Sequence, residues 1–330
     1  MKRDIFLQNE RRRQLVLAAG AAALTAPFGT FAQGISNRPV RIILGQTAAT
    51  TPDLIARTLA PRLQAKWNQP FLVENRGGAG GAIGMDAVAK SPPDGHIINI
   101  NVNSTLTLPL FFKIDFDVLN SFTPIAVLAQ NIFALAVHTS VPANNLKEYI
   151  EWAKKEGPRA NYGSPGNGTH HHLIMESLKL RTGLETTHIP YKGSAPATTD
   201  LIGGQISAMF IPLVTAIQFS RAGKVKLLGG SASARSPFLP DLPTIAEQGV
   251  PGFNFFAWFS AWGPPGMAPD LQQKYTNVFR EVLADPEVID VFTKNGASVR
   301  YGTPQELDKL NREDYQVLAK LVKDANIKGD

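Results

Sequence analysis

The segment from Val40 to Leu63, VRIILGQTAATTPDLIARTLAPRL, contains the unit from which the fold is built. Its first five residues, Val40–Leu44, form an apolar run that predicts a buried strand. Apolar residues then recur at i, i+4 and i+8 from Ile55, which predicts a helix over Pro52–Leu63. A short strand followed at once by a helix is typical of an α/β protein with a mostly parallel sheet.

The same alternation continues along the chain, which predicts two α/β units. The first unit adds strands at Phe71–Glu74 and Ile97–Val102 and a helix at Ile83–Lys90. The second unit has strands at Ala134–His138, Ala160–Tyr162, Thr187–Pro190, Ile206–Ile211 and Val225–Gly229, alternating with helices at Leu146–Lys155, His170–Arg181, Pro196–Ile202 and Leu213–Ala222.

Three helices are expected near the C-terminus, at Asp270–Ala284, Pro286–Lys294 and Pro304–Lys323. A helical tail of this kind packs against a sheet that is already formed, so we expect the first lobe to be discontinuous. Residues 33–129 and 254–330 would form lobe 1, and residues 130–253 lobe 2. Two crossover segments, near Ile125–Ala136 and Phe253–Ala261, would join the lobes.

Length and composition narrow the class of protein. A chain of 330 residues favours two domains. It has no cysteine, which excludes disulfides, thiolate nucleophiles and zinc–thiolate sites. The formal net charge is +6, and residues 1–32 contribute +3 of it. Because no basic run interleaved with aromatic residues follows, nucleic acid is not an expected partner.

The first 32 residues have the layout of a secretory signal peptide. A basic stretch, Met1–Arg13, precedes a small apolar run, Leu15–Ala26, and Thr30-Phe31-Ala32 offers a cleavage site. The apolar run is shorter than the roughly 20 residues that cross a bilayer. Arg12 and Arg13 also resemble a twin-arginine signal, so the export route stays open. We expect a mature periplasmic protein that begins near Gln33.

Three strand-to-helix junctions carry the residue types that bind anions. Helix N-termini expose backbone N–H groups and a partial positive charge, and ligands of open α/β sheets bind beyond the carboxyl ends of the strands. The first junction is GQTAATTPD at 45–53, with Thr51 as the expected N-cap, Pro52 at the first helical position and Asp53 in the first turn. Ordinary helix capping explains these residues equally well.

The second junction is YGSPGNGT at 162–169, where glycines allow close approach to the backbone and Ser164 and Thr169 add hydroxyl groups. The third is PYKGSAPA at 190–197, where Ser194 could cap the helix and Lys192 could face an anion. A turn with a threonine cap and a solvated lysine are the alternatives that spacing alone leaves open.

Other motifs do not support a cofactor or catalysis. The glycine run at 78–84 lacks the last glycine of a dinucleotide fingerprint, because Ile83 stands there, and no acid follows the next strand. Consecutive histidines at 170–172 point in different directions on a helix, so with Glu176 they do not complete a metal shell. No G-x-S-x-G elbow is present, and Ser164 beside these histidines does not by itself make a triad.

Longer blocks resemble the substrate-binding receptors of tripartite tricarboxylate transporters, the Bug family. They include RPVRIILGQ, PFLVENRGGAGGAIGMDAVAKSPPDGH, FTPIAVLA, NYGSPGNGTHHHLIMESL, HIPYKGSAPATTDLIGGQISAMF and RAGKVKLLGGSASARSPFLPDLPTIAEQGVPGF, in family order over the mature chain. The resemblance implies a type II periplasmic-binding-protein-like α/β fold, with two lobes joined by two crossover strands. It also implies a small carboxylate ligand, partner permease subunits in the membrane, no cofactor, no metal and no catalysis. We expect a monomer.

The resemblance implies that the loops Gln46–Thr51 and Ser164–Thr169 face each other across the cleft and hold the carboxylate groups of the ligand. The candidate ligand-binding residues are Gln46, Thr47, Ala48, Thr50, Thr51, Asp53, Asn103, Ser104, Ser164, Gly166, Asn167, Gly168, Thr169, Lys192 and Ile211.

Two departures from the family pattern bear on the ligand. The first loop, GQTAATTPD, has hydroxyl and amide side chains where the family has proline and glycine, and apolar Ile211-Pro212 follows Phe210. An apolar wall suits a ring or a longer carbon chain, so the hypothesis is a dicarboxylate, aromatic ones such as a phthalate isomer included. A periplasmic sensor module and a periplasmic hydrolase are the alternative functions.

Overall fold

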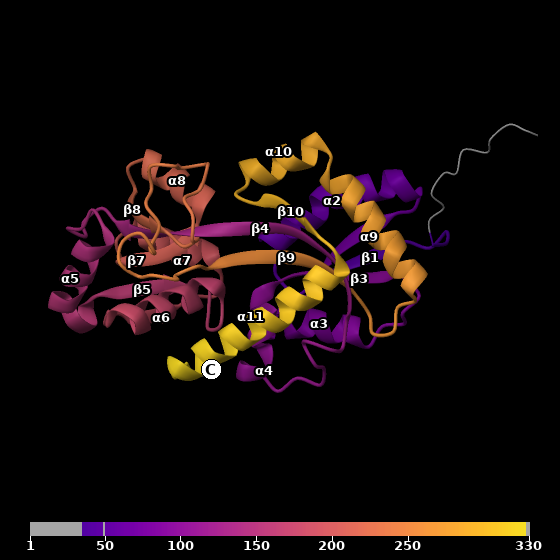
Figure 1. The fold of residues 1–330 in the computed structure, drawn as a ribbon, viewed down its shortest axis with the longest axis horizontal. Coiled ribbons are helices and arrows are strands. Elements are labelled where there is room, and N and C mark those ends of the chain that lie inside the picture. The colour runs from indigo at the N-terminus through magenta and orange to yellow at the C-terminus, as the bar shows by residue number, and fades with distance from the viewer. Residues whose placement is uncertain (1–34, 49, 328–330) are drawn as a thin grey trace, which may run out of the picture.

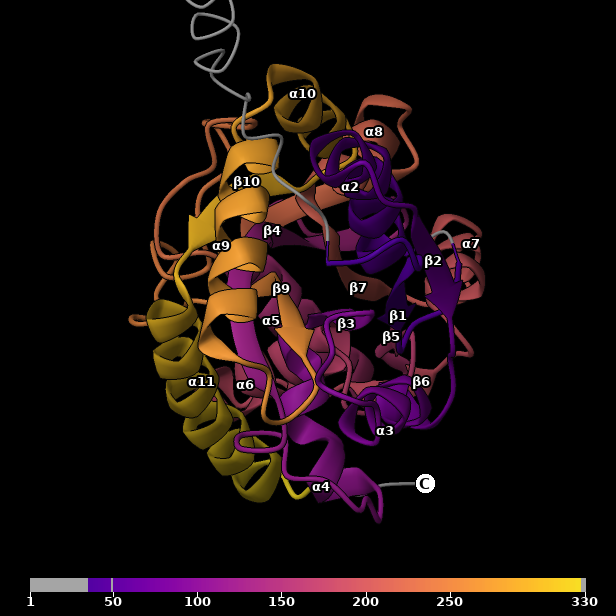
Figure 2. The same cartoon turned by 90° about the vertical axis from the view of Figure 1, so that its right-hand side faces the viewer.

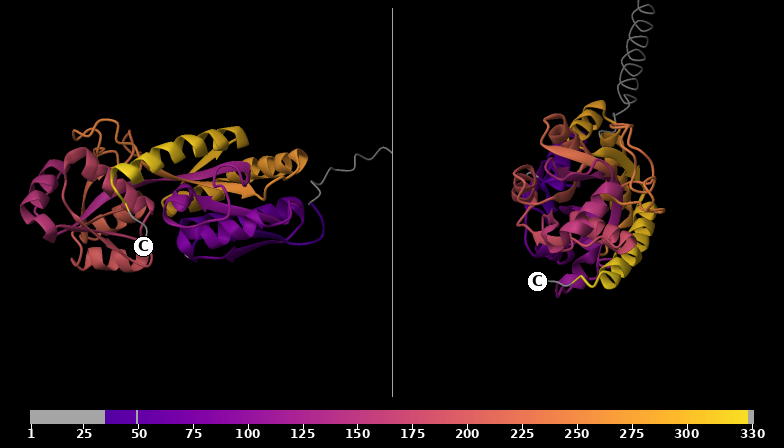
Figure 3. Two further views of the ribbon diagram at one scale, coloured as in Figure 1. Left: turned by 90° about the horizontal axis from the view of Figure 1, so that it is seen from below. Right: turned by 90° about the vertical axis from the view of Figure 1, so that its left-hand side faces the viewer.

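The computed structural model describes residues 35–48 and 50–327, and the expected signal peptide lies outside them. Two α/β lobes lie side by side and share one long strand, β4 (Thr123–His138), which confirms the predicted fold class (Figure 1). Figure 3 (left) shows β4 and the C-terminal helix running along the same side of both lobes.

Lobe 1 is built on a sheet in the order β2-β1-β3-β9-β4-β10. Its parallel part consists of β1 (Val40–Leu44), β2 (Phe71–Asn75) and β3 (Ile97–Val102), and its antiparallel part of β9 (Phe256–Gly263), the first half of β4, and β10 (Ser298–Gly302). Around it lie α2 (Thr51–Trp67), α3 (Ala82–Ala89), α4 (Leu108–Phe111), α9 (Pro269–Leu283), α10 (Pro286–Lys294), α11 (Pro304–Asp324) and the 3₁₀ turns η1 (Ala79–Gly81) and η2 (Asn103–Thr107). Figure 2 looks at this lobe end-on.

Lobe 2 has its own sheet in the order β6-β5-β7-β4-β8. Its strands are β5 (Asn161–Ser164), β6 (Thr187–Pro190), β7 (Ala208–Pro212), β8 (Val225–Gly230) and the second half of β4. Its helices are α5 (Leu146–Glu156), α6 (His170–Thr182), α7 (Ser194–Ile202) and α8 (Leu213–Arg221), with the 3₁₀ turn η3 (Gly157–Arg159).

The two connections between the lobes are tied together at one buried serine. Ser231 has no exposed surface, and its backbone N–H donates to Phe133 O on β4 (2.8 Å). Its hydroxyl accepts from Phe133 N–H (3.0 Å) and donates to Phe255 O, just before β9 (2.6 Å). The hinge therefore has a defined hydrogen-bonded centre.

Helix boundaries differ from the predicted ones for local reasons. Helix α2 starts at Thr51 with Thr50 as its N-cap, and it runs to Trp67 although Pro61 lies inside it, because Leu63 and Trp67 are buried on its inner face. Helix α7 starts at Ser194, so Gly193 is the N-cap and Ser194 is not. The expectation that both Thr51 and Ser194 cap their helices is therefore wrong by one residue.

The C-terminal helices complete the hydrophobic core. Helices α10 and α11 start at the predicted residues, Pro286 and Pro304, and α9 starts at Pro269, one residue before the predicted start at Asp270. In α11, Leu318, Leu321 and Val322 belong to one buried cluster with Leu173 of α6. The C-terminal helix thus packs against both lobes. None of the helices within residues 35–48 and 50–327 is long and apolar enough to cross a membrane.

Replacing Ser231 with alanine should destabilise the protein by about 1–3 kcal/mol, because the buried N–H of Phe133 and C=O of Phe255 lose their shared partner. Urea unfolding followed by circular dichroism measures this loss, and Ser233→Ala, at an exposed position two residues on, is the matched control. Equal stability of the two variants would contradict the hinge assignment.

Candidate functional site

The carboxyl ends of the parallel strands form one edge in each lobe. In lobe 1, β1 pairs in parallel with β2 and β3, so the loop after Leu44 and the turn η2 lie at the same edge. In lobe 2, β5 pairs in parallel with β6 and β7, so the loop after Ser164 lies beside the segments after Pro190 and Pro212. These are the edges at which ligands of open α/β sheets bind.

The two edges touch each other across the lobes. The Thr107 hydroxyl at the end of η2 lies 3.5 Å from Gly168 O in the second loop, and Thr107 is buried. The Phe111 ring of α4 lies so close to Gly168 that an added Cβ would stand 2.7 Å from it. Gly168 has a φ of +73°, which glycine adopts readily. The segments after β3 and β5 therefore face each other at the interlobe contact.

The first loop is anchored from below by amide groups. Asn75 at the end of β2 donates to Gln46 O (3.2 Å), and the Gln46 side chain lies over Gly81 beside Thr105 of η2. Gln46 Oε1 is inaccessible to solvent and has no hydrogen-bond partner within the described chain. An unpaired buried acceptor costs free energy, so the position of this side chain is set by its packing against Gly81 and Thr105.

The remaining residues of the first loop differ in how far their side chains are exposed to solvent. Thr47 and Ala48 are exposed, and Thr50 and Thr51 are partly buried. The Thr50 hydroxyl donates to Thr47 O (2.8 Å) and so closes the loop before the helix begins. Exposed backbone and a fixed helix N-terminus are therefore what this loop offers to an anion.

Asp53 is buried beneath this loop. Its Oδ1 accepts from Arg57 Nε (3.0 Å) and from Asn75 Nδ2 (3.0 Å), and Arg57 also donates to Asn75 Oδ1 (3.1 Å). The positive charge of Arg57 offsets the negative charge of this buried carboxylate. Asp53 thus holds the base of the loop.

Both the amide nitrogen and the amide oxygen of the Asn103 side chain form hydrogen bonds within lobe 1. Its Nδ2 donates to Asp314 Oδ2 of α11 (2.8 Å), and its Oδ1 accepts from the backbone N–H of Trp258 on β9 (3.1 Å). Trp258 Nε1 donates to the same carboxylate oxygen (2.5 Å). Burial raises the pKa of Asp314, and these two donors oppose that effect. Ser104, next along, is partly buried, and its carbonyl accepts from Thr107 (2.8 Å).

The second loop is built around Ser164, which has no exposed surface. The Ser164 hydroxyl lies 2.7 Å from His188 Nε2, and it accepts from Gly166 N–H (3.2 Å). The Thr169 hydroxyl donates to Gly166 O (2.8 Å) instead of capping α6. Asn167, at the tip, is partly buried. Sequence reasoning missed His188, because it lies on a different strand, 24 residues from Ser164.

Lys192 and Ile211 occupy different environments. Lys192 is exposed, directly after β6 at the carboxyl edge of lobe 2. Ile211 is 1% exposed and packs in a cluster with Ala134, Leu213 and Ile217. Its side chain contributes to the core of lobe 2 and presents no apolar wall to solvent in this structure.

The three histidines at the start of α6 are held in their neutral form. Burial lowers the pKa of His170 to about 4 and of His171 to about 3, with His170 adding to the second shift. Burial and Lys179 lower the pKa of His172 to about 4. Both ring nitrogens of His171 are inaccessible and have no partner in the described chain. No group of three or more metal-ligating side chains lies together among the described residues.

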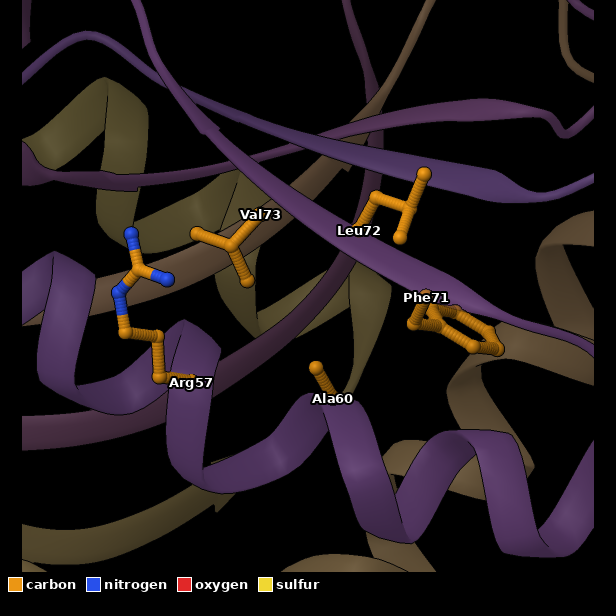
Figure 4. Close-up of a pocket in the computed structure, with 5 residues that line it drawn as sticks. All are labelled: Arg57, Ala60, Phe71, Leu72 and Val73. Atoms are coloured by element: carbon orange, nitrogen blue, oxygen red, sulfur yellow. The ribbon is translucent and has the colours of Figure 1, made fainter.

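A surface hollow lies on the outer edge of lobe 1 (Figure 4). It is lined by Arg57, Ala60, Phe71, Leu72 and Val73, between α2 and the edge strand β2. None of its lining residues is among the predicted ligand contacts. Because it opens beside a strand and not beyond strand ends, it lacks the helix N-termini that favour an anion.

Comparison with known proteins identifies the family. Residues 55–327 match the family described as "Tripartite tricarboxylate transporter family receptor". BugT of Bordetella pertussis is 31% identical over 310 residues, covering 93% of this chain and 94% of BugT. A UPF0065 protein of Pseudomonas sp. strain P51 is 30% identical over 315 residues, covering 94% of each chain. The chain belongs to this receptor family.

Solved structures agree with this assignment. The periplasmic binding protein BugD has a TM-score of 0.80 and 32% identity, over 89% of this chain and 100% of BugD. Rpa4515 of R. palustris with adipate has a TM-score of 0.82 and 30% identity, over 89% of this chain and 99% of its own. MatC of Rhodopseudomonas palustris with bound malate has a TM-score of 0.78 and 28% identity, over 86% and 99%.

The free energy of unfolding should fall in acid because of the histidines at the start of α6, His170, His171 and His172. A histidine whose pKa is lowered on folding stabilises the folded state in full at pH values above its unfolded pKa of 6.5. That stabilisation is lost as the pH falls toward the folded pKa. For His171, with a folded pKa of about 3, the loss between pH 7 and pH 5 is about 2 kcal/mol. His171→Gln should reduce the difference in unfolding free energy between these pH values by about that amount; an unchanged difference would contradict the burial of this ring.

Proposed function

We propose that this chain is a periplasmic solute-binding receptor, without catalytic activity, that holds a small dicarboxylate between the loops Gln46–Thr51 and Ser164–Thr169. The observation that carries the proposal is the contact between the two carboxyl edges, through Thr107 and Phe111 on one side and Gly168 on the other. A ligand that bridges these edges would stabilise the closed arrangement of the lobes.

The chemistry of the loops favours an anion. Each loop leads into a helix, α2 or α6, whose first-turn N–H groups lack intrahelical acceptors and carry partial positive charge. Asp53, the acid nearest to the first loop, is paired with Arg57. Hydrogen bonds to a charged group contribute about 1.5–3 kcal/mol each, so three or four are enough for micromolar affinity after the cost of closure.

The relatives support the dicarboxylate class. Adipate and malate, found with two structures of the same fold, are both dicarboxylates of four to six carbons. Two carboxylates suit two opposed helix N-termini better than one does. The hydroxyl groups of Thr47 and Thr51 add side-chain donors to the backbone of the first loop, whereas the Thr50 hydroxyl already donates to Thr47 O. We include longer and aromatic dicarboxylates in the proposal.

The receptor proposal includes delivery to the membrane subunits of a tripartite transporter, which the family description supports. It also includes a monomeric state in the periplasm. A hydrolytic role would require Ser164 as nucleophile with His188 as base. That serine has no exposed surface, and its hydroxyl is bonded to its own loop. The pair therefore serves the shape of the loop.

A thermal-shift screen against mono-, di- and tricarboxylates, sugars and nucleotides tests the ligand class. A ligand at about 100 times its Kd adds roughly 2.7 kcal/mol of stability, which raises the Tm by several degrees. Dicarboxylates should raise the Tm, and sugars and nucleotides should not. Hits confined to sugars or nucleotides would overturn the proposed function.

Charge substitutions in the two loops test the position of the site. Asn167→Asp adds one negative charge at the tip of the second loop with almost no change in shape, and Thr47→Asp does the same in the first loop, with Thr47→Asn as its control. Each charged variant should weaken dicarboxylate binding at least tenfold in calorimetry, because like charges repel at short range. Unchanged affinity in either charged variant would remove that loop from the site.

A further inference from the structure

Two stacked imidazoles lie beneath the second loop. The rings of His172 on α6 and His188 on β6 have centroids 3.9 Å apart and planes 14° apart. His188 also stacks on Tyr162 of β5, with centroids 4.8 Å apart and planes 20° apart. His172 is 4% exposed and His188 is half-buried. The stack thus joins three elements of lobe 2 directly under the predicted ligand loop.

Each imidazole bonds to a different end of that loop. Gly168 N–H donates to His172 Nδ1 (3.2 Å), so this nitrogen has no proton and the ring proton is on Nε2. His188 Nε2 lies 2.7 Å from the Ser164 hydroxyl, which also accepts from Gly166 N–H and lies 3.0 Å from Gly166 O. The loop is therefore fastened at its start by His188 and near its end by His172.

The backbone of this loop adopts a conformation that the hydrogen bonds to His172 and His188 stabilise. Gly166 and Gly168 have φ angles of +137° and +73°, and glycines at these positions leave an unfastened loop free to adopt many other conformations. Gly168 is also the residue that meets Thr107 and Phe111 of lobe 1. The loop conformation that the two imidazoles hold therefore sets the position of Gly168 at the contact between the lobes.

We propose that His172 and His188 are positioning residues for the ligand site, which hold the Ser164–Thr169 loop in its binding shape through a hydrogen-bond acceptor at Nδ1 of the first and a polar group at Nε2 of the second. The inference rests on the proposed function, because it takes this loop as one side of the site.

The surroundings of His172 keep it neutral under ordinary conditions. The charged and titratable groups that face it are Lys179 and Glu176 on its own helix, Tyr162 on β5 and His188 on β6; Tyr162 and Lys179 both donate to Glu176 Oε1, at 2.5 and 2.7 Å. Burial, with Lys179 adding, lowers the pKa of His172 to about 4. A protonated Nδ1 would oppose Gly168 N–H, so binding should weaken as the pH falls toward that value.

A crossed pair of substitutions separates these hydrogen bonds from simple packing. In asparagine the amide occupies the place of Nδ1, and in glutamine the place of Nε2, so each mimics one imidazole nitrogen. At position 172, Asn should bind within about threefold of the wild type and Gln should lose at least tenfold. At position 188 the order should be reversed, with Gln near the wild type and Asn at least tenfold weaker. Calorimetry with adipate and with malate at pH 7 measures all four variants.

Two further readouts keep the test decisive. Below pH 5 the affinity of both proteins should fall, because the carboxylates of the ligand are protonated there, and the fall should be larger for the wild type than for His172→Asn. Exchange of the Gly168 amide hydrogen, which needs no ligand, should be faster in His172→Gln than in His172→Asn by at least tenfold. If neither adipate nor malate binds the wild type, the dicarboxylate that raises its Tm in the thermal-shift screen replaces them; if no dicarboxylate does, the proposed function fails, and amide exchange alone decides the positioning role. The same rank of Asn and Gln at both positions, or equal exchange rates, would overturn the inference.

Discussion

The arrangement depends on strand β4, whose two halves belong to different sheets. Its first half pairs with β9 and β10 and its second half with β7 and β8, so one continuous segment of backbone fixes the position of one sheet relative to the other. Buried Ser231 then bonds β4 to the second connection between the lobes. Because backbone ladders resist stretching but allow bending and twisting, this construction permits rotation of the lobes while it keeps their carboxyl edges opposed.

The polar side chains around the two edges support the loops, and in the proposed site the backbone N–H groups of these loops bind the anion. Asp53 is neutralised by Arg57, and Asn103 is fixed by Asp314 and Trp258. Beneath the second loop, His172 and His188 are uncharged supports. The proposed anion site relies on helix N-termini and hydrogen bonds, so we expect it to select its ligand by the position of negative charge and by length.

Much of the fold could be predicted from the sequence, because the apolar periods of 2 and 3.6 residues are clear in most elements. Strand β10 was not predicted: it is a partly buried edge strand, and its sequence, SVRYG, has no apolar alternation strong enough to stand out. The start of α2 was misplaced by one residue, because Thr50 and Thr51 are chemically equivalent as caps and only the tertiary structure selects between them. The length of β4 exceeds its predicted parts, since the strand continues through the hinge.

The candidate loops could be located from strand-to-helix junctions, but the residues that hold these loops in place could not. His188, Asp314 and Trp258 act on loops that are distant in the sequence, and no local pattern relates them. For Ile211 the apolar character was evident from the sequence, but the direction of its side chain was not. Its burial in the core of lobe 2 depends on β7 lying beside β4. Side-chain direction on a strand follows from pairing, which a single sequence leaves undetermined.

The most direct measurement is a crystal structure of the protein grown with a dicarboxylate that raises its Tm, read from the difference density of the ligand. The account predicts one carboxylate within hydrogen-bond distance of backbone N–H groups in Gln46–Thr51 and the other within reach of Gly166–Thr169. Density for the dicarboxylate on one lobe only, or in the outer hollow beside Arg57, would contradict the central claim that opposed strand ends grip the ligand from two sides.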